Sequence, residues 1–143
     1  MRRAEAFAAR WGIGRAYGSY EDLLSDDAVD AVYVPLPNGL QHPWTLRALQ
    51  TGKHVLCEKP YSCSPAEVEE AFAEAEGRGL ILSEGFMYRD HSQISELARI
   101  VRDEGLMGDV RLAASSFTWP TDVPGDVRLD SSLEGGSLLD VGV

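Results

Sequence analysis

Apolar residues recur along the chain with two alternating spacings, one typical of helices and one typical of strands. The helical spacing falls in residues 4–11, 19–24, 44–49, 64–77 and 94–101. The continuous apolar run of residues 31–34 is typical of a strand buried on both faces. Residues 54–57 and 80–82 predict two more strands. Helices and strands that alternate with short connections predict a parallel α/β layer.

The pattern changes after about residue 92. Residues 94–101 predict a helix that ends near Gly105, and residues 110–119 form a longer, partly alternating run. Such a run is typical of a strand in a sheet with one solvated face. We therefore expect residues 1–88 to form one α/β unit and residues 89–143 to begin a second unit of α+β type.

Composition and charge exclude several classes of partner. The 143 residues carry a net charge of −10, from 13 Lys and Arg against 23 Asp and Glu. No basic cluster interrupts this acidity, so nucleic acid is not an expected partner. No apolar run approaches the roughly 18 residues of a membrane span. Cys57 and Cys63 match no common zinc spacing, so we expect no metal site and two reduced thiols in a cytoplasmic protein.

Chemically versatile residues follow two of the predicted strands. Ligands of open α/β sheets lie at the carboxyl ends of the strands, where residues 35–41 and 58–62 are expected. Lys59 at this edge could donate a proton to a substrate oxygen, or it could be a solvated lysine. Pro60 restricts the backbone and would fix the direction of Lys59. Glu58 could orient Lys59 or contact a cofactor, or it could be a surface acid.

Each of three other residues has both a functional and a purely structural interpretation. Asn38 could bind a ribose or an amide, or it could be a turn residue. Arg89, within Tyr-Arg-Asp-His, could help to bind a phosphate, a carboxylate or a sugar, or it could belong to a salt-bridged loop. Asp140 follows Gly135 and Gly136, which permit close backbone approach. It could assist a proton relay or be a carboxylate at a helix start.

The segment DAVYVPLPNGLQHPWTLRALQTGKHVLCEKPYS resembles the Gfo/Idh/MocA oxidoreductases, named for glucose-fructose oxidoreductase and inositol dehydrogenase. The later segments EGFMYRDHSQ, GLMGDVR and LEGGSLLDVGV resemble further blocks of that family, in the same order. The resemblance implies a Rossmann domain that binds NAD or NADP, followed by an α+β domain with an open sheet. It also implies hydride transfer to or from a sugar, cyclitol or related substrate, and a homo-oligomer.

The resemblance assigns roles to particular residues. Lys59 is the catalytic lysine of the Glu-Lys-Pro motif, and Asp140 is the acid of a later family block. Pro60 is implied to follow a cis bond. Gln41 stands where the family commonly has histidine. The cofactor-binding residues implied by the resemblance, Lys59 included, are Pro37, Asn38, Gln41, Glu58, Lys59, Pro60 and Arg89.

Two family features are expected outside these residues. The Gly-x-Gly-x-x-Gly turn would precede Met1, and a catalytic Tyr or His would stand four positions after Asp140, beyond Val143. The sequence therefore predicts an incomplete Rossmann-type sheet and the beginning of a second domain. We expect a fragment of an oxidoreductase that is inactive alone. The alternative is a truncated, non-catalytic protein that retains part of the fold.

Overall fold

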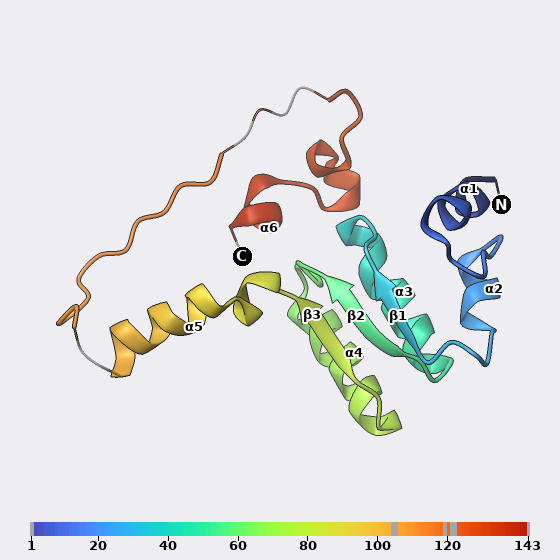
Figure 1. The fold of residues 1–143 in the computed structure, drawn as a ribbon, viewed down its shortest axis with the longest axis horizontal. Coiled ribbons are helices and arrows are strands. Elements are labelled where there is room, and N and C mark those ends of the chain that lie inside the picture. Colours follow the sequence, from blue (N-terminus) through green and yellow to red (C-terminus); the bar gives the residue numbers. More distant parts are fainter. Residues whose placement is uncertain (1, 104–105, 119, 121–122, 143) are drawn as a thin grey trace.

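The computed structural model describes residues 2–103, 106–118, 120 and 123–142. In the residues that it describes, six α-helices and three strands are joined by loops and single helical turns (Figure 1). The elements are α1 (Arg2–Trp11), α2 (Tyr20–Leu24), β1 (Ala31–Val34), α3 (Asn38–Gln50), β2 (His54–Glu58), α4 (Pro65–Arg78), β3 (Leu82–Gly85), α5 (Ser92–Ala98) and α6 (Ser137–Val141). The turns are η1 (Met87–Asp90), η2 (Arg99–Asp103), η3 (Val127–Leu129) and η4 (Ser131–Leu133).

The three strands form a parallel sheet in the order β1-β2-β3. Tyr33 pairs with Leu56 across β1 and β2, and Leu56 pairs with Ser83 across β2 and β3. Right-handed crossovers between neighbouring parallel strands place their helices on the same face. Helices α3 and α4 accordingly lie together behind the sheet (Figure 1). The predicted parallel α/β layer is confirmed.

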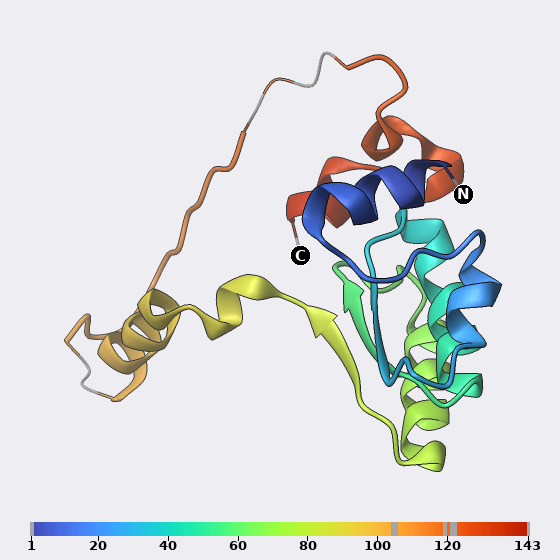
Figure 2. The same cartoon turned by 45° about the vertical axis from the view of Figure 1, so that its right-hand side comes forward.

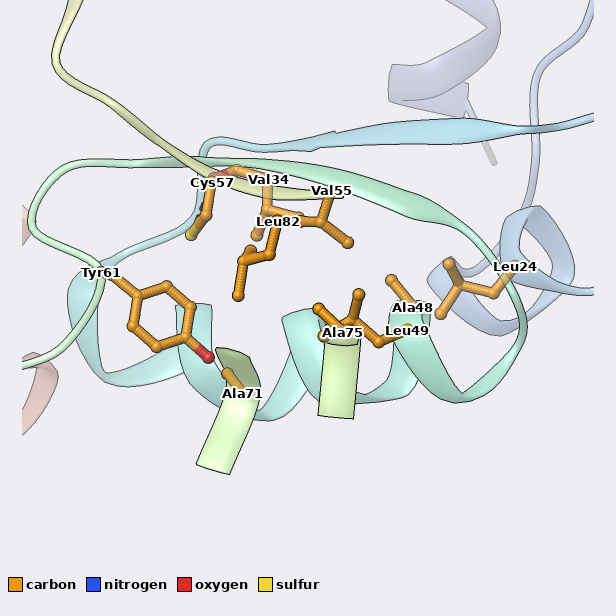
Figure 3. Close-up of a cluster of buried hydrophobic side chains, with 10 residues drawn as sticks. All are labelled: Leu24, Val34, Ala48, Leu49, Val55, Cys57, Tyr61, Ala71, Ala75 and Leu82. Atoms are coloured by element: carbon orange, nitrogen blue, oxygen red, sulfur yellow. Dashed lines mark hydrogen bonds between the residues drawn. The ribbon is translucent and has the colours of Figure 1, made fainter. Parts of the chain in front are cut away.

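The core lies between the strands and these two helices. Figure 3 shows its buried side chains, and they come from α2, β1, α3, β2, the loop after β2, α4 and β3. Leu49 and Ala71 are fully buried where the two helices pack beneath the strands. Sequence signals place α4 well: Pro65 occupies its first turn, and Gly79 ends it in a left-handed conformation with φ of 67°.

The prediction that β1 is buried on both faces is wrong. Side chains alternate along the strands, and Tyr33 is 55% exposed while Val34 is buried. On β2, Leu56 is 45% exposed between the buried residues Val55 and Cys57. The reason is that α3 and α4 cover one face only, and Figure 2 shows the strands from an angle at which the other face is open. Within the described residues no helix packs on that second face.

Two boundaries differ from those that the pattern predicts. Helix α3 begins at Asn38, earlier than the helical spacing of residues 44–49 predicts. Strand β3 covers Leu82–Gly85, two to three residues later than the run of residues 80–82. Hydrophobicity alone misplaces it, because Ser83, Glu84 and Gly85 pair with β2 through their backbones, which carry no hydrophobic signal.

The predicted strand over residues 110–119 is also wrong where it can be described. Residues 110–118 are irregular and extended, and Trp119 lies outside the described residues. A strand persists only when a neighbour takes up its backbone hydrogen bonds. No described strand pairs with this segment, because the sheet contains β1, β2 and β3 alone. The chain then returns, and its last described residues lie above the upper end of the sheet (Figure 1).

Candidate active site

Lys59 lies at the carboxyl edge of the sheet, directly after β2. Its Nζ donates hydrogen bonds to the backbone oxygen of Asp140 and to Oδ1 of the same residue, the latter at 3.2 Å. Both side chains are 23% exposed, so the ion pair is partly shielded from water. The Lys59–Pro60 peptide bond is cis, as expected. Two residues that lie 81 positions apart in the sequence are thus in direct contact.

A close backbone approach brings Asp140 to this place. A Cβ atom on Gly135 would stand 2.6 Å from the backbone oxygen of Arg128, nearer than real Cβ atoms come. Gly136 has φ of 140°, which L side chains rarely adopt. Both glycines are therefore required by the turn that leads into α6, and the expected close approach is confirmed. Helix α6 then carries Asp140 toward Lys59.

Asn38, the first residue of α3, contacts the same C-terminal segment. Its side-chain Nδ2 donates a hydrogen bond to the backbone oxygen of Glu134 at 2.8 Å. Gly39 lies beside Leu133, where an added Cβ would be in ordinary contact at 3.6 Å. The start of α3 and the loop after β2, both at the carboxyl edge of the sheet, therefore contact residues 133–140.

Two of the cavities at this edge have Glu58 or Lys59 in their walls. The first has a volume of about 260 Å³, and its wall consists of Lys59, Gly85, Phe86, Met87, Tyr88, Phe117, Asp140 and Val141. The second, of about 420 Å³, opens on the uncovered face of the sheet and is bounded by Tyr33, Leu56, Glu58, residues 83–87 and Asp90. Each cavity is mostly apolar with a few charged groups at its edge, which is usual for sites that bind small organic molecules.

Glu58 lies between Lys59 and the uncovered face. Its Oε1 accepts a hydrogen bond of 2.5 Å from the hydroxyl of Tyr33, and its Oε2 accepts one of 3.2 Å from the backbone N–H of Lys59. The bond to the carboxylate raises the pKa of Tyr33, because it stabilises the protonated hydroxyl. Glu58 thus links the backbone N–H of Lys59 to the hydroxyl of Tyr33.

Not every residue proposed from the sequence lies at the cavities. Gln41 is 1% exposed; its Nε2 donates to the backbone oxygen of Leu36, and its Oε1 is 3.6 Å from Sγ of Cys57. Its amide is therefore used inside the core. Arg89 is exposed on η1 and belongs to neither cavity wall described above. Pro37 precedes α3 and lines a small cavity of about 30 Å³ that also touches Asn38 and Asp140.

Sequence reasoning missed Tyr33, although a signal was present. In a parallel pair, residues two apart on a strand share a face. Tyr33 pairs with Leu56, so Glu58 lies on the same face as Tyr33 and within reach of its hydroxyl.

Among the residues that the structure describes, no group of three His, Cys, Asp or Glu side chains is placed to hold a metal ion.

Comparison with known proteins defines the class of this fold. Residues 1–86 match the model of an oxidoreductase family with an NAD-binding Rossmann fold. A solved structure of KijD10, a 3-ketoreductase from Actinomadura kijaniata in complex with NADP and TDP-benzene, superposes with a TM-score of 0.92 at 45% identity. That superposition covers 99% of this chain and 43% of the other. The chain has the fold of an NAD-binding oxidoreductase.

Curated relatives give the same result over nearly the whole chain. The dTDP-3,4-didehydro-2,6-dideoxy-α-D-glucose 3-reductase of Actinomadura kijaniata is 47% identical over 141 residues, which cover 99% of this chain and 42% of the relative. D-xylose 1-dehydrogenase (NADP(+)) 2 of Haloferax volcanii is also 47% identical, with coverages of 98% and 43%. The protein belongs to the Gfo/Idh/MocA family, as the sequence motifs indicate.

The chain spans less than half the length of the curated relatives that it matches. Trans-1,2-dihydrobenzene-1,2-diol dehydrogenase of Oryctolagus cuniculus, 42% identical, is matched over 43% of its length by the whole of this chain. In the part of the chain described by the structure, each helix is too short or too polar to cross a membrane.

Proposed function

We propose that this chain is part of an NAD(P)-dependent oxidoreductase that transfers hydride to or from a carbon bearing a hydroxyl or keto group. The observation that carries the proposal is the contact of Lys59 with Asp140 at the wall of an apolar cavity, at the carboxyl edge of a parallel sheet. Ligands of open α/β folds bind at this edge. Three relatives are named as sugar reductases or dehydrogenases or as a diol dehydrogenase, which supports a polyol or sugar-like substrate.

The described residues fit part of a nicotinamide site. The two cavities meet along residues 85–87, and Glu58 and Lys59 contribute charged groups to their edges. A largely apolar wall with few polar groups suits a flat ring whose amide needs hydrogen bonds. We infer that Glu58, Lys59 and Pro60 border the ring and that Pro37 and Asn38 lie alongside it. The related enzymes named with NADP favour NADP over NAD.

When bound, the nicotinamide would supply or accept the hydride, and Lys59 would supply or accept the matching proton. In the reducing direction its ammonium donates a proton to the carbonyl oxygen as the carbon is reduced, and the resulting amine takes a proton from solvent. In the oxidising direction the neutral amine accepts the hydroxyl proton. Asp140 holds the ammonium in place through the bonds described above.

We also propose which domain each part of the chain belongs to. Residues 1–88 would belong to the nucleotide-binding domain, and residues 89–143 would begin a substrate domain that also forms the contacts of a homo-oligomer. Cys57 and Cys63 are both free thiols, which favours a reducing, cytoplasmic location.

A chimera tests the proposal. This chain replaces the matching segment of the Actinomadura kijaniata reductase, so that the rest of the fold comes from a relative 47% identical to it. We expect NADPH oxidation with the keto-sugar substrate of the parent enzyme. We also expect Lys59→Ala to lower kcat by roughly 10²–10⁴-fold, the usual range for a group that transfers a proton. A folded chimera that binds NADPH and turns over equally well after Lys59→Ala would remove Lys59 from the reaction.

A further inference from the structure

Three polar side chains meet on the helix-covered side of the loop that follows Lys59. The hydroxyl of Tyr61 is 2.9 Å from Nδ1 of His42 in α3. Nε2 of the same histidine is 3.3 Å from Oε2 of Glu70 in α4. The rings of His42 and Tyr61 meet edge to face with centroids 5.9 Å apart. Tyr61, His42 and Glu70, called the relay below, therefore connect the loop to both helices beneath the sheet.

The partners of His42 determine which nitrogen carries its proton. A carboxylate can only accept, so the 3.3 Å contact of Nε2 with Oε2 of Glu70 favours the tautomer that carries its hydrogen on Nε2. In the neutral ring Nδ1 is then an acceptor, and the hydroxyl of Tyr61 donates to it. Burial raises the pKa of Tyr61 above its usual range, so this hydroxyl keeps its proton. The hydroxyl of Tyr61 and Nδ1 of His42 therefore pair with each other, and Glu70, whose side chain is 62% exposed, contacts Nε2 from the surface.

Tyr61 is held at its backbone as well as at its hydroxyl. Its N–H donates a hydrogen bond of 2.8 Å to Oε1 of Glu84 on β3. Pro60, whose ring fixes φ, is the only residue between Tyr61 and Lys59. On the other side of Lys59, its own N–H is bonded to Glu58. Lys59 therefore stands between two residues whose positions are fixed by separate elements.

Packing alone does not account for the relay. Tyr61 is 3% exposed, and Figure 3 shows it extending from the loop toward α3 and α4. A phenylalanine would fill the same volume without the need to pair a buried hydroxyl, and burying an unpaired hydroxyl or imidazole is costly. None of the three relay residues is among those that bound the cavity beside Lys59. Any effect of the relay on chemistry must therefore pass through the loop.

We propose that the relay positions Lys59: it fixes the direction in which the loop leaves β2 and so holds the ammonium against Asp140. Tyr61, His42 and Glu70 are positioning residues, and Lys59 remains the acting group. The inference rests on the proposed function only in taking Lys59 as the group that transfers the proton. The arrangement itself can be measured without cofactor or substrate.

The sequence offers an internal control for this measurement. The chain contains two lysines, Lys53 and Lys59. Lys53 is buried, and its Nζ donates a hydrogen bond of 2.9 Å to the backbone oxygen of Asp26, away from the relay. NMR spectra of the chain labelled with ¹³C at the lysine ε-carbon should therefore show two signals. The Lys53 signal reports the fold, and the Lys59 signal, with its nuclear Overhauser contact to Asp140, reports the position of the ammonium.

Two substitutions should release Lys59 without unfolding the chain. In Tyr61→Phe we expect the contact between Lys59 and Asp140 to be lost and the Lys59 signal to narrow, while Lys53 is unchanged. His42→Leu should do the same. His42→Asn should restore the Lys59 signal, because its amide oxygen can stand near the place of Nδ1 and accept from Tyr61. A residue that merely packs would give no such rescue.

Several outcomes would overturn the proposal. An unchanged Lys59 signal in Tyr61→Phe would show that the hydroxyl does not position it. Loss of both lysine signals would make Tyr61 a residue of the fold and not of the site. The unsubstituted chain could also give a narrow Lys59 signal with no contact to Asp140. That result would show that the ammonium is not held against Asp140 at all.

The same variants separate this inference from the proposed function. In the chimera, Tyr61→Phe should lower kcat and leave the KM for NADPH unchanged, because the relay does not touch the cofactor. If the NMR contact depends on the relay but the chimera transfers no hydride, the proposed function fails and the positioning stands. If the chimera is active and Tyr61→Phe changes neither kcat nor the Lys59 signal, the positioning fails and the function stands.

Discussion

The two residues of the candidate site come from parts of the molecule that differ in packing. Lys59 belongs to the packed part, residues 20–85, which contains the sheet, the helices α3 and α4 and the core. Asp140 belongs to the C-terminal part, residues 106–142, in which none of the described residues is buried. The C-terminal part is held instead by local turns, such as those in which Asp126 and Asp130 accept bonds from nearby backbone N–H groups.

Because only one of the two parts has a buried core, the two parts should contribute differently to the stability of the chain and to the assembly of the site. Burial of apolar surface dominates folding energy, so the packed part should carry nearly all the stability of the chain. The C-terminal part meets it through polar contacts at the loops, namely Asn38 with Glu134, Lys59 with Asp140, and Cys63 with Glu134. We therefore expect substitutions in the first part to change the free energy of unfolding and substitutions in the second to change the site.

The largest effect is expected from matched leucine substitutions in the two parts. Leu49→Ala empties a fully buried position in α3 and should lower the free energy of unfolding by about 2–5 kcal/mol. Leu112→Ala, at a position 84% exposed, should change it by less than about 0.5 kcal/mol. Urea denaturation followed by circular dichroism measures both. Equal losses would mean that the C-terminal part packs more tightly than described.

A smaller effect is expected at the contact between the parts. Asn38→Ala removes the hydrogen bond to the backbone oxygen of Glu134, a contact of about 1 kcal/mol. We expect faster amide hydrogen exchange in residues 131–141 and unchanged exchange in β2. Asn38→Asp is the matched control, because it keeps the size of the side chain but cannot donate the bond. Unchanged exchange near Asp140 in both variants would show that Asn38 does not hold the C-terminal part.

Acid should weaken the packed part through Asp26. Hydrogen bonds from the Tyr17 hydroxyl, the Ala28 N–H and Arg15 lower the pKa of this carboxyl from 3.8 to about 2. Because the pKa of Asp26 is lower in the folded state, its carboxylate stabilises the fold fully above pH 3.8. This stabilisation is lost as the pH falls through about 2. Asp26→Asn should be less stable at neutral pH and should show a smaller loss of thermal stability across this window. A parallel pH profile in the two proteins would rule out this role.

The smallest effect is expected at the two thiols. Burial raises the pKa of Cys57 to about 11, whereas Cys63 is exposed and its pKa is raised chiefly by a hydrogen bond to Glu134. Iodoacetamide should modify Cys63 in the native chain and Cys57 only after unfolding, because the thiolate is the reactive form. Glu134→Gln should speed the reaction of Cys63 modestly. An unchanged rate would show that the two parts do not meet at Cys63.

Local signals were enough to predict the packed part. Apolar runs located β1 and β2, and helical spacing located α4 and the short helix α2, whose N-cap Ser19 accepts a hydrogen bond from the N–H of Asp22. Spacing could not foresee that the face of β1 bearing Tyr33 is uncovered, because burial depends on which helices pack where. It also predicted a strand over residues 110–119, where pairing with another strand decides the structure and no described strand pairs with residues 110–118.

The site was predictable in part for the same reason. The sequence and its family resemblance pointed to Lys59 and Asp140, and the structure brings the two together. Gln41 was matched by its position in a motif, but its amide is used in the core, which no local pattern reports. The contact of Tyr61 with His42 links residues 19 positions apart on different elements. Such contacts follow from tertiary packing and are invisible to spacing alone.

The most direct test of the account is a double-mutant cycle between its two parts. Lys59→Ala, Asp140→Asn and the double variant are compared in the chimera by their kcat values and by their dissociation constants for NADPH. If the two residues act as one unit, the double variant should be about as slow as Lys59→Ala alone, because removing the lysine leaves Asp140 nothing to hold. Losses that simply multiply would show that Lys59 and Asp140 act independently and would contradict the site described here.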